Sequence, residues 1–439
     1  MSVSGDVIAV VIDDTADRIG LLRAQVSDKT YPALSARLPQ AQAFERELFE
    51  TTTTRPEGHP WLKPLRSHAG PHPFFVEEGP SIHEVAVGPV HAGIIEPGHF
   101  RFQCHGEVVH HLEVQLGYQH RGAIELFLRS SPARRMLIAE SIAGDTAVGH
   151  ALAHVQVIEA LGKLEVGPAA QSVRAIALEL ERLSNHVGDL GALCNDVGYL
   201  PGASWFGRLR GEFLNMLMEL TGNRFGRSLL MPGGVRFGIS SEQRKDWLVR
   251  LARSERDLRD TAELMFATPS VCSRFEQTGI VLKEDAEALG LVGPVARASG
   301  PRRDGRQDHP FGAYRTSPIA TAFAEGGDVM ARATVRWLET LSSIAFVRTQ
   351  LEHAPVDSSA RRNVGLAANQ ISASLVEGWR GEIVHVALTS ETGELSSYQI
   401  VDPSMHNWYA LTLAMRGRQI SDFPLCNKSF NLSYAGHDL

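Results

Sequence analysis

Long segments with a helical spacing of apolar residues dominate the middle of this sequence. Two of them, 134–161 and 171–198, are separated by a short stretch that contains glycine and proline. Apolar residues that recur every three or four positions form one hydrophobic stripe, which a helix must bury against other elements. The same spacing predicts further helices over 206–222, 241–267 and 325–353, the last with a Gly-Asp start. We therefore expect a helical bundle.

Alternating apolar and polar residues predict strands on either side of this helical region. Residues 80–120 are typical of paired strands, and Gly106 lies between two alternating runs, where it can form a hairpin turn. Residues 381–404 have the pattern of a second strand pair. The predicted fold class is α+β, mainly a helical bundle with β-hairpins attached at its ends.

The N-terminal region has a different pattern and predicts a separate small α/β domain. Residues 7–12 form a β-branched run typical of a buried strand, and residues 39–50 have helical spacing. The polar, proline-rich stretch 51–66 is expected to be an ordered loop or a linker, and the Gly- and Pro-rich stretch 68–75 marks a boundary. We therefore divide the chain into residues 1–75 and 76–439.

Composition excludes several classes of protein. A net charge of −7 over 439 residues argues against a broad nucleic-acid-binding surface. No apolar run reaches the length of a membrane-spanning helix, about 18 residues or more. The four cysteines form no CxxC pair and are expected to be reduced, which excludes a disulfide framework or a metal finger. No glycine-rich nucleotide-binding motif is present.

Eight segments match one superfamily in the same order. They include GEVVHHLEVQLGYQHRG, ALELERLSNHVGDLGAL, EGWRGEIVHV and VDPSMHNWYAL. Over residues 85–439 the chain resembles the large subunit of membrane-bound, formate-hydrogenlyase-type (group 4) [NiFe] hydrogenases and the homologous 49-kDa subunit of complex I. Residues 30–66 resemble the end of the 30-kDa complex I subunit, in a shortened form. The resemblance implies a hydrogenase-large-subunit fold after residue 75.

The sequence departs from working hydrogenases at the metal ligands. In that family two CxxC pairs hold nickel and iron, because thiolates are the soft ligands that these metals require. The corresponding positions here are Ala143 and Thr146 in the first motif and Ser433 and Gly436 in the second. None carries a thiolate. The resemblance combined with these losses predicts a chain that binds no metal.

The loop that precedes the paired strands carries features of both branches of the superfamily. His91 matches the first histidine of the complex I quinone loop, whereas Ile95 replaces the second. Glu96 follows, as in the hydrogenase branch, where an acidic residue serves proton transfer. The chain is therefore expected to be a hydrogenase-branch member that lost its metal independently.

Three ionisable residues lie on the segment of the first lost motif, namely Glu140, Asp145 and His150. We expect all three on one helix, where they either form a proton path or hydrogen-bond to one another in a filled pocket. Arg182 and His186 match positions beside an iron–sulfur cluster that a partner subunit holds. The alternative is that His186 is a core histidine and Arg182 pairs with a nearby glutamate.

Several other polar residues have a possible site role and a structural alternative. Arg121 could clamp backbone carbonyls or approach a cluster. Arg380, Asp304 and Arg306 match polar positions around the family's central cavity, with buried Arg–Asp pairing as the alternative. Asp402 and His406 are expected to cap and order the last helix.

These observations give one main functional hypothesis. The chain would be a metal-free subunit of a membrane-associated, complex-I-like oxidoreductase, cytoplasmic and peripheral to the inner face of the membrane. It would dock on a small iron–sulfur subunit and on membrane subunits related to antiporters, and would pass electrons to a quinone-like acceptor, relay protons, or both. One alternative is a non-redox scaffold or coupling subunit of an ion-translocating membrane complex. Another is an active hydrogenase with altered ligands.

Overall fold

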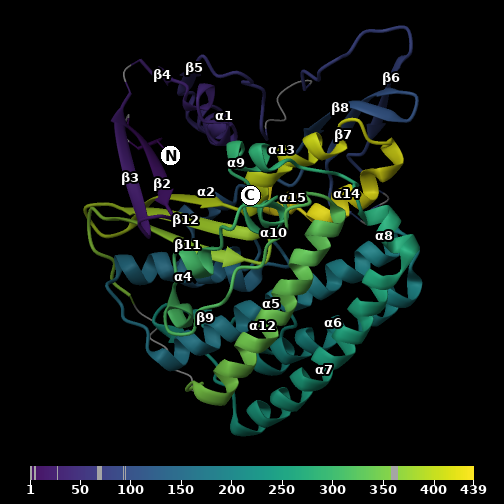
Figure 1. The fold of residues 1–439 in the computed structure, drawn as a ribbon. Coiled ribbons are helices and arrows are strands. Elements are labelled where there is room, and N and C mark those ends of the chain that lie inside the picture. The colour runs from purple at the N-terminus through teal and green to yellow at the C-terminus, as the bar shows by residue number, and fades with distance from the viewer. Residues whose placement is uncertain are drawn as a thin grey trace.

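The computed structural model describes residues 2–3, 6–26, 28–66, 72–91, 93, 95–356 and 364–439. The predicted boundary stretch 68–75 therefore lies partly outside the described residues. The α+β fold class predicted from the sequence is confirmed: a helical bundle fills one side, and small sheets lie against it (Figure 1).

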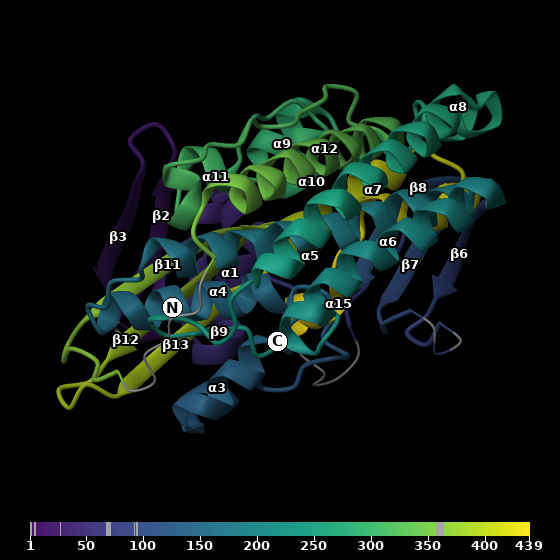
Figure 2. The same ribbon diagram turned by 90° about the horizontal axis from the view of Figure 1, so that it is seen from below.

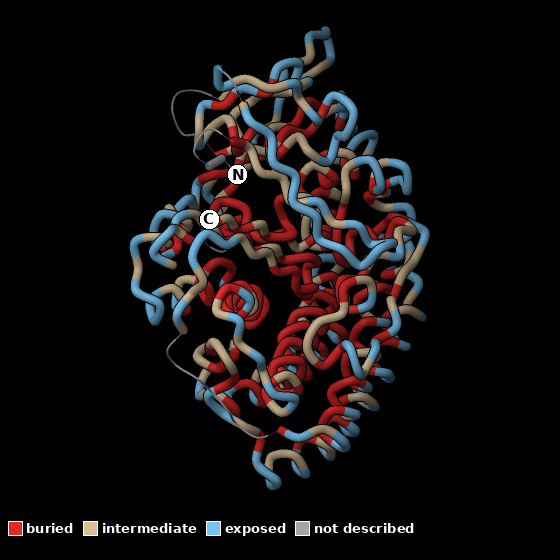
Figure 3. The backbone as a smooth tube through the Cα atoms, turned by 90° about the vertical axis from the view of Figure 1, so that its left-hand side faces the viewer, coloured by how far each residue is buried: buried red, intermediate tan, exposed pale blue. Residues whose placement is uncertain are grey.

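Four long helices form the bundle: α5 (Pro168–Asp196), α6 (Leu200–Thr221), α7 (Ser241–Ala267) and α12 (Val329–His353). Figure 2 shows them side by side. Helix α5 packs against α6 and α12 and is buried along nearly its whole length. In Figure 3 the buried residues (red) lie mostly in the interior and the exposed ones (pale blue) mostly at the outside. The helical segments predicted after residue 170 are thus confirmed.

Local sequence explains where these helices begin and end. Ser240 and Gln243 form a reciprocal capping box at the start of α7. The Asp328 side chain accepts a hydrogen bond from the Ala331 amide at the start of α12, at the predicted Gly-Asp start. Helix α6 ends at Gly222, whose φ of +75° is left-handed.

The helix predicted over 134–161 is wrong as a single element. Helix α3 (Pro132–Ala139) ends at Glu140, residues 140–146 form a turn-rich loop, and α4 (Ala147–Leu161) begins after Thr146. Apolar spacing continues through the loop, so periodicity alone could not reveal it. The interruption depends on tertiary contacts of Asp145 described below.

Two three-stranded antiparallel sheets flank the bundle. One consists of β6 (Ile82–Val87), β7 (His99–His105) and β8 (Val108–Gln115); Gly106 lies in the β7–β8 turn with a φ of +57°, which confirms the predicted hairpin. The other consists of β11 (Ile371–Gly378), β12 (Gly381–Thr389) and β13 (Leu395–Val401), one strand more than predicted. Helix α4 packs on this second sheet (Figure 1).

The N-terminal strands differ from the prediction in their burial. Strands β1 (Ser2–Val3), β2 (Asp6–Asp13) and β3 (Arg18–Gln25) form an antiparallel sheet that extends to one side in Figure 1. The predicted buried strand over 7–12 is correct as a strand but wrong in burial, because most of its residues are only half-buried and Val11 is exposed. A β-branched run indicates strand geometry and cannot show what covers it.

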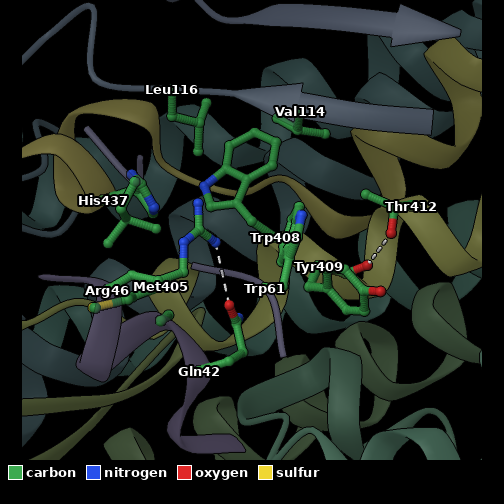
Figure 4. A pocket seen from close by; sticks show the side chains of 12 residues that line it. Gln42, Arg46, Trp61, Val114, Leu116, Met405, Trp408, Tyr409, Thr412 and His437 are labelled. Carbon is green, nitrogen blue, oxygen red and sulfur yellow. Dashed lines mark hydrogen bonds between the residues drawn. The ribbon is translucent and has the colours of Figure 1, made fainter. Parts of the chain in front are cut away.

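Helix α1 (Gln42–Thr52) docks this N-terminal region onto α13 (Pro403–Met415). Arg46 of α1 donates to the Lys63 and Pro64 carbonyls and lies over the Trp61 ring, which in turn contacts Tyr409 of α13. A cavity of about 50 Å³ remains between these side chains (Figure 4). Residues 51–66 are thus an ordered loop rather than a free linker, with β5 (Arg55–Glu57) inside it.

The other elements are short, and their bounds complete the description of the fold. They are η1 (Leu34–Ala36), η2 (Pro39–Ala41), β4 (Thr30–Pro32), α2 (Ala123–Arg129), β9 (Leu230–Met231), β10 (Gly234–Val235), α8 (Pro269–Phe275), α9 (Lys283–Ala288), α10 (Gly293–Arg297), α11 (Gly305–Asp308), η3 (Gly312–Arg315), η4 (Ile420–Asp422), α14 (Phe423–Phe430) and α15 (Tyr434–Asp438). Among the described residues, no helix has the length and hydrophobicity needed to cross a bilayer.

The predicted cap at Asp402 is confirmed, although it starts α13 and two more helices follow. The Asp402 carboxylate accepts a hydrogen bond from the Ser404 amide at 2.8 Å. His406 does not take part in this cap. Its ring instead meets Phe44 of α1 edge-on, with 5.2 Å between centroids, so it belongs to the contact with the N-terminal region.

Candidate functional site

Two segments that are far apart in sequence meet where the family motifs predict the metal ligands. We call the place where residues 140–146 meet residues 431–436 the two-loop site. Arg121 joins the two segments: one guanidinium nitrogen donates to the Ser141 carbonyl at 2.8 Å, and the other to the carbonyls of Ile142 at 2.8 Å and Ala435 at 3.4 Å. The predicted clamp on backbone carbonyls is therefore what Arg121 forms.

Arg380 joins the same two segments from the tight turn between β11 and β12. Its guanidinium pairs in a bidentate manner with Asp145, at 2.6 and 2.8 Å, and its Nε donates to the Asn431 carbonyl at 2.6 Å. Burial raises the pKa of Asp145, but the Arg380 charge outweighs it, so the net pKa is lowered and the carboxylate is ionised. The predicted Arg–Asp pairing thus holds for Arg380.

The first pair of lost ligand positions offers no free donor to a metal. Ala143 is fully buried and carries no polar side-chain atom. The Thr146 hydroxyl oxygen accepts hydrogen bonds from Arg380 at 3.2 Å and from the Trp379 indole at 3.1 Å. These contacts fix the loop that precedes α4.

The second pair of lost ligand positions also offers no free metal ligand. The Ser433 hydroxyl oxygen accepts from the Gly436 amide at 2.9 Å and so caps α15. A Cβ atom added at Gly436 would lie 2.5 Å from the carboxylate of Asp402. The space that a cysteine needs at this position is therefore occupied by a buried acidic side chain.

This crowding gives a test of the site's geometry. We expect Gly436→Ala to lower the free energy of unfolding by about 1–3 kcal/mol, because overpacking forces a buried neighbour to move. The matched control is Gly417→Ala, where no atom lies within 4 Å of the added Cβ, although its φ of +72° carries its own backbone cost. Chemical denaturation measures both. The double variant Gly436→Ala with Asp402→Ala should show a clearly smaller loss than the sum of its parts, and strict additivity would contradict the crowding.

The donor set in the two-loop site does not fit a nickel–iron centre. Such a centre requires soft ligands, whereas this site offers two hydroxyl groups that are already bonded and a carboxylate paired with arginine. In the part of the chain that the structure describes, no group of three or more His, Cys, Asp or Glu side chains is placed to hold a metal ion. No step of chemistry is therefore derived through a metal here.

The three predicted site residues of the first motif do not share a helix. Glu140 lies at the end of α3, and its carboxylate accepts from the Ser228 amide at 2.6 Å. Asp145 lies in the loop, and His150 lies on α4, where its Nε2 bonds Asp402 at 3.0 Å. The structure therefore brings Asp145 and His150 to the two-loop site and gives Glu140 different partners.

Glu96 reaches the two-loop site from the segment between β6 and β7. Its carboxylate accepts from the Tyr434 amide at 3.3 Å. Burial raises the pKa of Glu96, and the charge of Arg380 only partly offsets this effect. Glu96 is thus a carboxyl that holds a proton more readily than usual. His91, in the same loop, bonds the Gly98 carbonyl at 2.9 Å.

Glu181 is a site residue that sequence reasoning did not select. Its carboxylate accepts from the Val148 amide at 2.7 Å and the Gly149 amide at 3.1 Å, so it covers the N-terminus of α4. Burial raises the pKa of Glu181 to about 8, with these two hydrogen bonds acting in the opposite direction. The only sequence signal was an acidic residue on a buried helix face.

This raised pKa predicts a pH dependence of stability. The folded chain holds a proton on Glu181 that the unfolded chain releases near pH 4.3, so stability should fall as the pH rises from about 4.3 to 8. Glu181→Gln should remove this loss and be more stable than the wild type above pH 8, by an amount on the order of a few kcal/mol. Thermal unfolding between pH 5 and 9 measures it. The exposed Glu242→Gln variant should show the same pH dependence of stability as the wild type. The same pH dependence in Glu181→Gln would contradict the raised pKa of Glu181.

A second cluster of buried charges lies beside the two-loop site, between α5, α12 and β11. Arg306 pairs with Asp304 at 2.7 Å, which confirms the Arg–Asp alternative for these residues. Arg297 pairs with Glu339 at 2.6 Å and Glu377 at 2.8 Å. We call the set of these residues with Glu179 and Arg182 the arginine–carboxylate cluster.

Arg182 belongs to this cluster and His186 lies beside it, and each is fully buried. Arg182 pairs with Glu179 at 3.2 Å and with Glu339 at 3.3 Å. His186 Nε2 bonds Glu339 at 2.8 Å, while its Nδ1 is buried and has no hydrogen-bond partner among the described residues. The pairing predicted for Arg182 is present, and His186 keeps one ring nitrogen free.

Comparison with known proteins agrees with the sequence motifs. The family model described as "Respiratory-chain NADH dehydrogenase, 49 Kd subunit" matches residues 196–373. Hydrogenase-4 component G of Escherichia coli K12 is 29% identical over 93% of this chain and 76% of its own length. The chain is therefore similar both to the large subunits of membrane-bound hydrogenases and to the 49-kDa subunit of complex I. This confirms the predicted resemblance.

Other similar proteins include a complex I subunit and a chain of a respiratory membrane complex. A component of the NADH-quinone oxidoreductase of Chloroherpeton thalassium is 29% identical over 72% of this chain and 78% of its own length. A chain in the structure of the membrane-bound sulfane sulfur reductase, an archaeal respiratory membrane complex, superimposes with a TM-score of 0.75 at 21% identity, over 82% of this chain and 99% of that one. That likeness shows the fold. The relatives are components of multi-subunit membrane complexes.

Proposed function

We propose that this chain is a metal-free large subunit of a membrane-associated, complex-I-like oxidoreductase. The observation that carries the proposal is the two-loop site, where Asp145 and Arg380 form a bidentate pair at the place of the missing thiolates. This arrangement gives the two-loop site charged, hydrogen-bonded groups and no soft ligand. Such groups can bind and protonate an organic acceptor, whereas they do not supply the ligands for nickel.

Electrons would reach the two-loop site from an iron–sulfur cluster in a small partner subunit. Partner cysteines must hold the cluster, because this chain has no CxxC pair. His186 supports an entry point near α5, because its buried Nδ1 is free and its ring meets Trp379 edge-on with 6.2 Å between centroids. Trp379 in turn adjoins Arg380 in the two-loop site.

A quinone-like acceptor takes two electrons and two protons on reduction. Arg380 would stabilise negative charge that develops on the acceptor oxygen. Glu96 would supply a proton, since burial raises its pKa and its carboxyl group lies at the edge of the site. Membrane subunits would dock on the same complex and place the chain at the membrane surface.

A non-redox scaffold is the second candidate, and one observation favours it. The Asp145–Arg380 pair and its bonds to Asn431 and Thr146 fill the two-loop site from both segments. A subunit that only assembles or gates a membrane module would need such a closed site and nothing more. In that case no acceptor binds.

Purification of the whole complex decides between these candidates. We expect stoichiometric iron from the partner clusters. We also expect quinone to reoxidise the reduced clusters, which electron paramagnetic resonance can monitor. Reduced clusters that quinones never reoxidise would favour the scaffold. Hydrogen evolution with stoichiometric nickel would overturn both and indicate an active hydrogenase.

A further inference from the structure

Five buried side chains form an unbroken line of hydrogen bonds that starts at the two-loop site. Asp402 Oδ2 bonds His150 Nε2 at 3.0 Å, and His150 Nδ1 bonds His385 Nε2 at 3.2 Å. His385 Nδ1 then bonds the Tyr398 hydroxyl at 2.9 Å, and the same hydroxyl bonds His154 Nδ1 at 2.9 Å. We call these five residues the histidine chain. Each is at most 2% exposed.

Regular secondary structure places the members of the histidine chain. His150 and His154 are four residues apart on α4 and therefore share one helix face. Tyr398 lies on β13. Asp402 follows four positions later, directly after the strand ends, so the two side chains point to the same face of the sheet. His385 lies on the neighbouring strand β12, diagonal to Tyr398 in the register. Helix α4 packs on this sheet, so the two sets of side chains meet.

The hydrogen bonds run in one direction along the histidine chain. Burial raises the pKa of Asp402, but its hydrogen bond from His150 and the Arg380 charge outweigh burial and lower it, so Asp402 is ionised and can only accept. With a neutral His150 ring, Nε2 donates to Asp402 and Nδ1 accepts, which makes His385 the next donor. Tyr398 donates to His385 and accepts from His154. Burial lowers the pKa of His385, which keeps its ring neutral as this order requires.

The far end of the histidine chain reaches a cavity of about 310 Å³ that opens at the surface. Pro132 and Gly365 at its rim are exposed. Its lining consists of His154 together with Pro132, Arg135, Met136, Ile158, Pro232, Val364, Gly365 and Leu366. A cavity of this size holds several water molecules. A network that served only to satisfy buried polar groups would not need to end at such a cavity.

We propose that the histidine chain conducts protons between this cavity and Asp402 in the two-loop site. A proton taken up at His154 Nε2 from water releases the proton on Nδ1 to Tyr398. Tyr398 passes its own proton to His385, His385 passes one to His150, and His150 passes one to Asp402. One proton enters, one arrives, and no other bond changes. This assignment deepens the proposed function, because it gives the two-loop site a proton supply separate from Glu96.

Solvent exchange of the buried ring protons tests this conduction without any redox assay. Nitrogen-15 NMR of the full-length chain can follow the Nε2–H protons of His150 and His385. In Tyr398→Phe, which removes one hydroxyl and keeps the ring, their exchange should slow by about a hundredfold. Tyr314→Phe is the matched control, because Tyr314 is also buried and its hydroxyl bonds Glu179 outside the histidine chain. It should leave the exchange unchanged.

Three results would overturn the proposal. These are unchanged exchange in Tyr398→Phe, equal slowing in Tyr314→Phe, or ring protons on the opposite nitrogens. Should Tyr398→Phe fail to fold, His154→Leu at the cavity end must produce the same slowing. The Trp379 indole N–H, which donates to Thr146 outside the histidine chain, reports general opening and should not change. Absence of quinone reduction would refute the proposed function and leave this exchange measurement intact.

Discussion

Arg297→Met should lower the free energy of unfolding by about 3–5 kcal/mol, because it leaves buried carboxylates without their partner. Arg297 is fully buried and pairs with both Glu339 and Glu377. Glu377 would lose its ion-pair partner and keep the Gly305 amide at 3.2 Å, whereas Glu339 would lose its closest arginine contact and keep Arg182 and His186. Denaturant unfolding of the purified chain measures the loss.

A surface pair provides the control for this prediction. Arg259→Met breaks an exposed pair with Glu255 and should cost about 0–1 kcal/mol. Adding Glu377→Gln to Arg297→Met should recover part of the loss, since one unpaired charge is then removed. A loss in Arg297→Met as small as that of the surface control would mean that the arginine–carboxylate cluster does not hold the bundle to β11.

Glu96→Gln should reduce quinone reduction by about a hundredfold or more, because a positioned proton donor contributes about 10²–10⁴ to such a step. The substitution keeps an acceptor oxygen for the Tyr434 amide and removes the acidic carboxyl proton. Stability should change little, since Glu96 is only half-buried and the amide oxygen of glutamine can still accept from the backbone amides of Tyr434 and Ala435. Steady-state assays of the whole complex with a soluble quinone measure the effect.

The matched control is Glu125→Gln, an exposed carboxylate in the first turn of α2, which should keep wild-type activity. The defect in Glu96→Gln should lie in the turnover number and show an increased solvent isotope effect. Equal activity of Glu96→Gln and wild type would remove Glu96 from the proton path. The histidine chain would then be the remaining proton route among the described residues.

Local signals in the sequence were sufficient for the bundle. The capping residues Ser240 and Asp328 mark helix starts that the structure confirms, and Gly106 marks a hairpin. Local reasoning failed at residues 140–146, because the partner of Asp145 is Arg380, 235 positions away. A bidentate pair over that distance leaves no periodic trace near either residue.

The candidate site was only partly predictable for the same reason. The family motifs include Asp145, Arg121 and Arg380, and the structure brings these three residues together at the two-loop site. They did not indicate the histidine chain, although its signals were present. His150 and His154 have helical spacing, and Tyr398 and Asp402 have strand spacing, in segments that were already predicted as helix and strand. That these two faces meet depends on α4 packing on the sheet.

We propose that the two-loop site holds no nickel–iron centre, because none of the four ligand positions carries a thiolate. The most direct measurement is the nickel content of the purified complex, together with anomalous X-ray scattering at the nickel edge around Ala143, Thr146, Ser433 and Gly436. We expect nickel far below one ion per chain and no anomalous peak between these residues. Stoichiometric nickel with a peak at this place would contradict it.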